Sequence, residues 1–145
     1  MTQATDNPLP AYARVLGWAG LLPFIGLPLA ILLDPHHAVL WGEIMASYAL
    51  AIICFLVGVW WGIALIRRSV AALVLSNAVV IVAFFGHVLL TVESFLLLCA
   101  LLFPGTVIIE RRLRLFRPQP AYYARLRMLL TVVATASLLI AAYGV

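Results

Sequence analysis

Residues 41–66 read WGEIMASYALAIICFLVGVWWGIALI, an apolar run of 26 residues that is closed by Arg67 and Arg68. Because an α-helix rises 1.5 Å per residue, about 20 apolar residues cross the roughly 30 Å hydrocarbon core of a bilayer. The run is therefore long enough to cross a membrane as a tilted helix. It is continuously apolar and does not alternate with polar residues, which excludes a membrane-spanning strand.

Runs of similar character occupy most of the remaining chain. The 145 residues are 66% hydrophobic and 10% charged, whereas a soluble domain carries about a quarter charged residues. The sequence predicts an all-α polytopic membrane helix bundle in one domain, residues 1–145, with the weakest break between spans at residues 91–94. The five predicted spans are residues 14–33, 41–66, 70–90, 93–109 and 123–143.

The charged residues predict the orientation of these spans. Alternating topology puts all nine arginines on one side, together with Asp6 and Glu110, for a net charge of +7 on that side. The other side holds Asp34, Glu43 and Glu93, a net charge of −3, and the two sides together give the +4 of the chain. By the positive-inside rule the amino terminus is expected inside and the carboxyl terminus outside.

The net charge does not indicate a nucleic-acid partner, because the arginines lie in short connections between apolar runs and form no extended basic surface. Residues 110–117 are expected to form a basic, partly apolar strip against the inner leaflet, where anionic lipid attracts arginine. Arg125 and Arg127 are expected to snorkel from the last span back to the same interface. The partners predicted at this face are the bilayer and its anionic lipid.

Three features inside the spans are candidates for packing or polar contacts. Gly58 and Gly62 form a small-xxx-small pair, which lets two helix backbones approach closely and is interpreted as packing within the bundle; a homodimer face is the alternative. Asn77 is expected to hydrogen-bond across to another helix, with a pore contact as the alternative. Residues 14–33 contain two prolines and three glycines, which predict a kinked, closely packed helix or, alternatively, a broken helix lining a substrate site.

The topology gathers histidines and carboxylates at the outer end. His87, Glu43 and Glu93 are the candidates, with Asp34 and the pair His36 and His37 nearby; imidazole and carboxylate are the usual ligands of zinc and iron. None of these residues has helical ligand spacing, so we interpret them as interfacial polar residues and expect no metal and no cofactor. Motifs for nucleophilic, zinc-protease or phosphate-loop chemistry are absent from the sequence, and we expect no catalytic residue and no enzyme.

Three stretches resemble the transmembrane protein 69-like proteins, an uncharacterised family grouped as a domain of unknown function. They are LGWAGLLPF at residues 16–24, residues 48–62 ending in VWWG, and YYARLR at residues 122–127 followed by Leu130 and Thr131. The resemblance covers nearly the whole chain and departs at Trp60, where the family pattern leads us to expect histidine. It implies a small multi-pass protein of the bacterial inner membrane with mitochondrial relatives, and it implies no activity.

These features favour a non-catalytic accessory or assembly component of the membrane, acting as a homo-oligomer or with a membrane protein partner. The alternative is a small oligomeric permease or channel for a small solute, because five short helices alone enclose little aqueous volume. A third hypothesis is a membrane metal protein or enzyme that uses the outer histidine and carboxylate set. A hydrophilic cavity reaching Asn77 would favour transport, and convergence of His87, Glu43 and Glu93 would favour a metal site.

Overall fold

The computed structural model describes residues 9–117 and 119–145, and Asp6, which enters the predicted topology, lies outside these ranges. The described part of the chain is helical apart from short turns and connections. Five helical segments are long and apolar enough to cross a membrane, so this is a multi-pass membrane protein. The sequence-based prediction of an all-α bundle of five spans is confirmed. The helices are α1 (Leu9–Ala19), α2 (Leu22–Leu33), α3 (Ala38–Arg67), α4 (Val70–Leu89), α5 (Val92–Arg112) and α6 (Ala121–Gly144), with a short 3-10 turn η1 (Pro35–His37) before α3.

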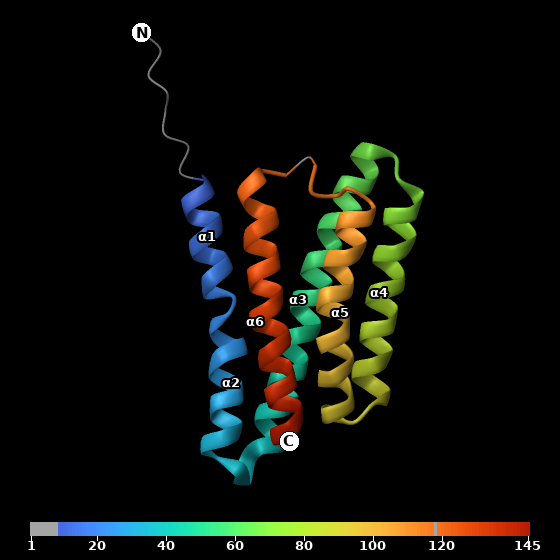
Figure 1. Ribbon diagram of the computed structural model, residues 1–145. Coiled ribbons are helices and arrows are strands. Elements are labelled where there is room, and N and C mark those ends of the chain that lie inside the picture. The colour runs from blue at the N-terminus through green and yellow to red at the C-terminus, as the bar shows by residue number, and fades with distance from the viewer. Residues whose placement is uncertain (1–8, 118) are drawn as a thin grey trace.

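α1 and α2 lie end to end, and α3, α4, α5 and α6 run beside them along the same axis (Figure 1). α3 packs against α2, α4 and α5, and α6 packs against α5 and α2. α1 lies against α6, while its continuation α2 is inserted between α3 and α6. The half of the bundle that contains α1 is therefore packed less tightly than the half that contains α2.

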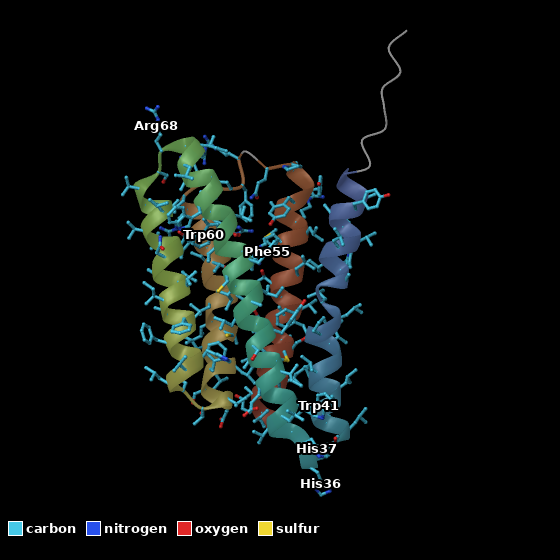
Figure 2. All side chains as sticks on the ribbon, turned by 180° about the vertical axis from the view of Figure 1, so that it is seen from behind. His36, His37, Trp41, Phe55, Trp60 and Arg68 are labelled. Carbon is cyan, nitrogen blue, oxygen red and sulfur yellow. The ribbon has the colours of Figure 1, made fainter. Side chains whose placement is uncertain are left out.

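The two ends of the bundle differ in charge. One end, here called the arginine end, carries the α3–α4 turn and the α5–α6 connection, and it lies opposite His36 and His37 (Figure 2). Its arginines outside α6 are Arg14 on α1 and Arg67, Arg68, Arg111, Arg112, Arg114 and Arg117 at the ends of α3 and α5 and in the connections. The opposite end, here called the carboxylate end, carries η1, the α4–α5 turn and the C-terminus (Figure 1), with Asp34, Glu43 and Glu93.

The first predicted span consists of two helices. α1 ends at Ala19 and α2 begins at Leu22, with Pro23 in its first turn. Proline lacks the backbone donor that a continuous helix needs. The Tyr48 hydroxyl on α3 donates a 2.8 Å hydrogen bond to the carbonyl of Gly20 at this break. The interruption is thus bonded to a neighbouring helix, as expected for a backbone carbonyl at a helix break inside a membrane.

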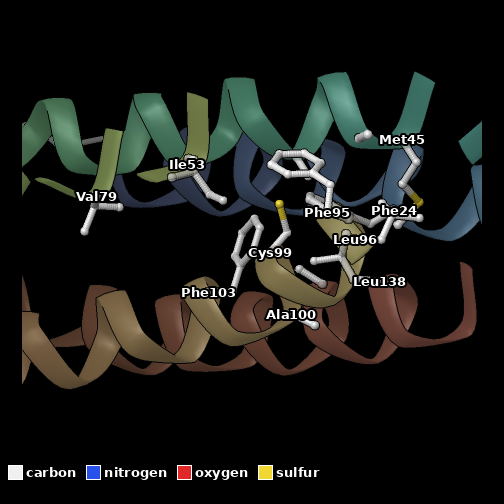
Figure 3. Close-up of a cluster of buried hydrophobic side chains, with 14 of the residues drawn as sticks. Phe24, Met45, Ile53, Val79, Phe95, Leu96, Cys99, Ala100, Phe103 and Leu138 are labelled. Atoms are coloured by element: carbon white, nitrogen blue, oxygen red, sulfur yellow. The ribbon is translucent and has the colours of Figure 1, made fainter. Parts of the chain in front are cut away.

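The core is a continuous apolar cluster that extends from Ala64 and Leu115 near the arginine end to Ala38 and Met45 near the carboxylate end, and Figure 3 shows part of it. Phe24 of α2 makes edge-to-face contacts with Tyr48 of α3 at 5.3 Å and with Phe103 of α5 at 5.5 Å between ring centroids. These contacts tie three helices together. Side chains that are essentially inaccessible in this cluster include Met45, Ile53, Phe95, Leu96, Cys99 and Leu138.

Polar side chains at the helix starts fix two of the turns. The Ser69 hydroxyl accepts a hydrogen bond from the Ala72 amide at the start of α4, and the Thr91 hydroxyl accepts one from the Ser94 amide at the start of α5. Such caps satisfy amides that lack a partner within the helix. Leu90 and Thr91 form the short connection where the sequence predicted its weakest break.

The basic strip was predicted to start at Glu110, and this boundary is wrong. α5 continues to Arg112, three residues past the predicted end of the span, so Glu110 lies in the last turns of this helix. Its side chain is 6% exposed and points into the bundle, not along a membrane surface. Beyond α5, the guanidinium of Arg67 donates a 2.7 Å hydrogen bond to the carbonyl of Arg114, which joins the two connections at the arginine end.

Candidate functional site

A buried polar cluster lies near the arginine end, where α3, α5 and α6 meet. Thr106 and Glu110 stand four residues apart on α5, and Arg127 and Thr131 stand four residues apart on α6. Residues at this spacing share one face of a helix, so two polar pairs face each other across the interface. Trp60 of α3 completes the polar cluster, and all five side chains are at most 6% exposed.

An ion pair is the centre of the polar cluster. Arg127 Nε lies 3.4 Å from Glu110 Oε2, and the indole N–H of Trp60 donates a 3.0 Å hydrogen bond to Glu110 Oε1. A charge in a bundle core is costly to desolvate unless a partner of opposite sign lies close to it. Both oxygens of this carboxylate therefore have a positively polarised neighbour, from two different helices.

The two threonines hold the other end of the guanidinium. Arg127 donates to the Thr131 hydroxyl at 2.5 Å and to the Thr106 hydroxyl at 2.8 Å. The Thr131 hydroxyl in turn donates a 2.8 Å hydrogen bond to the backbone carbonyl of Arg127. The Thr106 hydroxyl donates a 2.7 Å hydrogen bond to the backbone carbonyl of Phe103. The guanidinium is thereby fixed in position and joins α5 to α6 in addition to neutralising Glu110.

The prediction that Arg127 snorkels to the interface is wrong. Its side chain is 3% exposed, whereas Arg125, on the same turn of α6, is exposed as expected. Arg127 is turned inward because a buried carboxylate lies within reach on α5, and such a pair is the usual arrangement for charges inside a membrane protein. Sequence reasoning missed Glu110, Thr106, Thr131 and Trp60 as members of this site; the two pairs at four-residue spacing were the available signal.

An apolar groove begins at the polar cluster and runs along the bundle between α1, α3 and α6. Its volume is about 540 Å³, and its polar lining residues are Gln119, Tyr123 and Arg127. The groove exists because α1 packs on α6 and leaves the neighbouring face of α3 uncovered. Its apolar walls include Leu16, Gly17, Ile52, Phe55, Val59, Leu126 and Leu130.

The structure brings only part of the predicted outer set together. Glu43 and His87 line one pocket of about 340 Å³ at the carboxylate end, with Ser47. Glu93 is exposed and is absent from the lining of this pocket. The His87 ring packs against Phe95 at 4.9 Å between centroids. Within residues 9–117 and 119–145, no group of three histidine, cysteine or acidic side chains could hold a metal ion.

The remaining histidines at this end make a local contact. His37 Nδ1 lies 2.9 Å from Asp34 Oδ2, three residues away, and both side chains are largely exposed to the surroundings. His36 is exposed at the tip of η1 (Figure 2). An exposed pair of this kind contributes at most about 1 kcal/mol to stability.

The predicted contact of Asn77 with another helix is wrong. Its side chain is exposed on α4, and its amide donates a 2.8 Å hydrogen bond to the carbonyl of Leu73 on the same helix. The neighbouring Ser76 is the residue that points inward, and it bonds to the same carbonyl at 2.8 Å. Asn77 therefore satisfies its own amide N–H without a partner helix.

The prediction that Gly58 and Gly62 pack within the bundle is wrong as well. A Cβ atom added at either glycine would meet nothing within 4 Å, and both residues are exposed on α3. We call this pair the glycine ledge. Figure 2 shows Trp60 on the side of α3 toward α4 and α5, and Phe55 on the side toward α6 and α1. The ledge is open beside Phe55, which also lines the groove.

A match to a protein family extends over almost the whole chain but assigns no activity. Residues 9–143 match the family described as "Protein of unknown function (DUF3429)". No solved structure matches the chain.

Proposed function

The chain belongs to the DUF3429 family of proteins of unknown function, and we propose that it is a non-catalytic accessory or assembly component of a membrane complex. The observation that carries this proposal is that the members of the polar cluster contact one another across three helices. Glu110, Arg127 and Trp60 are engaged with one another and with two threonine hydroxyls. These contacts join α3, α5 and α6, and we assign them the role of holding the bundle together.

The glycine ledge is the proposed contact for a partner helix. Small residues four apart let a second helix approach closely, and association inside a membrane depends on such close packing. Within residues 9–117 and 119–145, nothing lies within 4 Å of a Cβ atom added at Gly58 or Gly62. A transmembrane helix of another protein is the occupant that fits an accessory role, and a second copy of this chain is the competing occupant.

The proposal extends to the membrane and its orientation. We place the chain in the bacterial inner membrane, with the arginine end facing the cytoplasm, because arginine-rich connections remain on that side during insertion. The residues at 16–24, 48–62 and 122–127 favour the transmembrane protein 69-like group as the closer relationship.

The alternatives have less support. A permease would need a polar path through the bundle, yet Asn77 faces outward and the groove is lined mainly by apolar side chains. A metal protein or enzyme at the carboxylate end would need Glu93 to join Glu43 and His87, and it does not line their pocket.

The test is native mass spectrometry of the tagged chain released gently from its own membrane, compared with variants of the glycine ledge. Gly62→Leu fills the ledge, and Gly26→Leu is the matched control because Gly26 on α2 also has nothing within 4 Å of its Cβ position. We expect a stoichiometric partner on the wild-type chain and on Gly26→Leu, and its loss from Gly62→Leu. Retention of the partner by Gly62→Leu contradicts the ledge contact. A bare or self-associated chain that passes a small solute in vesicles overturns the accessory role.

A further inference from the structure

We propose that the groove between α1, α3 and α6 binds an anionic glycerophospholipid, with one acyl chain between the helices and the head group at the arginine end. This inference is independent of the accessory role. It rests on the shape of the groove, on the polar atoms at its end and on the arginines around that end.

The dimensions of the groove fit one acyl chain. Its volume of about 540 Å³ lies within the range of ligand sites. Its lining on α6 runs from Tyr123 to Ala134, which is about 16 Å at the rise of an α-helix. One leaflet of a bilayer is about 15 Å thick in its hydrocarbon part. A chain that enters from the leaflet at the arginine end therefore reaches the end of the groove near the bilayer centre.

The walls match the chemistry of an acyl chain. Leucine, isoleucine, valine and phenylalanine side chains from α1, α2, α3 and α6 line the groove, and Phe55 on its edge is 70% exposed. Two glycines of the first span, Gly17 and Gly20, also line it. A water-soluble ligand would gain nothing from this surface, whereas a lipid already dissolved in the bilayer can move in sideways.

One hydrogen-bond acceptor at the polar end of the groove has no donor. Gln119 Oε1 is buried and has no hydrogen-bond partner within the described part of the chain. A buried acceptor without a donor costs free energy, and a head group that carries a hydroxyl would supply one. Phosphatidylglycerol has such hydroxyls, whereas phosphatidylcholine has no donor in its head group.

Charge complementarity selects an anionic head group. Arg117 lies two residues before Gln119, which lines the groove. Arg125 lies at the same end of α6 but on the helix face opposite Tyr123, so it adds positive charge to the surface of that end and does not line the groove. Arg117 and Arg125 are exposed, and arginines at a membrane surface attract anionic lipid. Arg127, in the wall itself, is already paired with Glu110, so the exposed arginines provide the attraction.

The test measures lipid binding to the full chain, purified in detergent and depleted of lipid, by native mass spectrometry with phosphatidylglycerol or phosphatidylcholine of the same acyl chains. We expect one phosphatidylglycerol per chain, bound about tenfold or more tightly than phosphatidylcholine. Val59→Trp fills the groove and should abolish this binding. Val74→Trp is the matched control, because Val74 is exposed on α4 and does not line the groove.

A second variant keeps the test decisive if Val59→Trp does not fold. The double substitution Arg117→Gln and Arg125→Gln alters exposed side chains only, and it should remove the preference for phosphatidylglycerol while the chain still folds. Equal binding of the two lipids by the wild-type chain overturns the proposal. So does unchanged binding by folded Val59→Trp, or a dimer that disappears in Val59→Trp, because a second copy would then occupy the groove.

Discussion

Replacing Arg127 by methionine should destabilise the bundle more than any other single arginine substitution on α6. Two unit charges 3.4 Å apart attract each other by about 5 kcal/mol at an effective dielectric constant of about 20. Desolvation offsets much of this attraction in the intact pair, but removing one partner leaves Glu110 buried without a counter-charge. We therefore expect the free energy of unfolding to fall by about 3–5 kcal/mol.

The unfolding of micelle-bound protein by sodium dodecyl sulfate provides the assay. Labelling of the buried thiol of Cys99 reports opening, in a Cys54→Ser background because Cys54 is only half-buried. Arg125→Met is the matched control: it removes an exposed arginine from the same helix and should change the free energy of unfolding by no more than about 0.5 kcal/mol.

A double substitution separates the charge from the shape of the site. Glu110→Met combined with Arg127→Met removes both charges and leaves apolar side chains, which in buried pairs is often neutral. We expect the double variant to be more stable than Arg127→Met alone, which is the coupling that a double-mutant cycle detects. If Arg127→Met and Arg125→Met unfold at the same detergent concentration, the ion pair does not hold the helices together and the reasoning is refuted.

Three further outcomes follow from individual contacts. Trp60→Phe removes the donor 3.0 Å from Glu110 Oε1 and should lower the free energy of unfolding by about 1–3 kcal/mol in the same titration. Asn77→Leu should leave insertion and unfolding unchanged, because the amide is exposed and bonded within its own helix; a loss above about 1 kcal/mol would contradict this. An alkaline phosphatase fused after Val145 should be active, because the arginine end is expected inside; an inactive fusion with intact expression would reverse the orientation.

The number and position of the helices could be predicted because the hydrophobic effect acts on long segments. An apolar run of about 20 residues has few stable alternatives to a membrane-spanning helix, and arginines or prolines mark the places where runs end. The exceptions are local. Glu110 belongs to α5 although it begins a charged stretch, since a single buried carboxylate is tolerated when Arg127 and Trp60 lie beside it. The break at Gly20 was expected as a kink, and Tyr48 supplies its partner.

The site could not be predicted because it depends on the rotation of each helix about its axis. Ser76 and Asn77 are neighbours, and a rotation of about 100° decides which of them faces the bundle; the structure turns Ser76 inward. Arg125 and Arg127 are two residues apart, so about 200° separates them around α6, and one is exposed while the other is buried. Hydropathy is nearly uniform around these helices, so no apolar face in the sequence fixes the rotation.

Arg127 is a member of the polar cluster and also lines the groove, so it connects these two features physically. One side of its guanidinium is held by Glu110 and the two threonines, and its side chain also forms part of the groove wall. Because the ion pair fixes the rotation of α6, it also fixes the positions of Leu126 and Leu130 in that wall. A lipid that binds only the folded bundle stabilises it by mass action. Added phosphatidylglycerol should therefore raise the unfolding midpoint of the wild-type chain more than that of Arg127→Met, whereas a helix bound at the glycine ledge has no such dependence on Arg127.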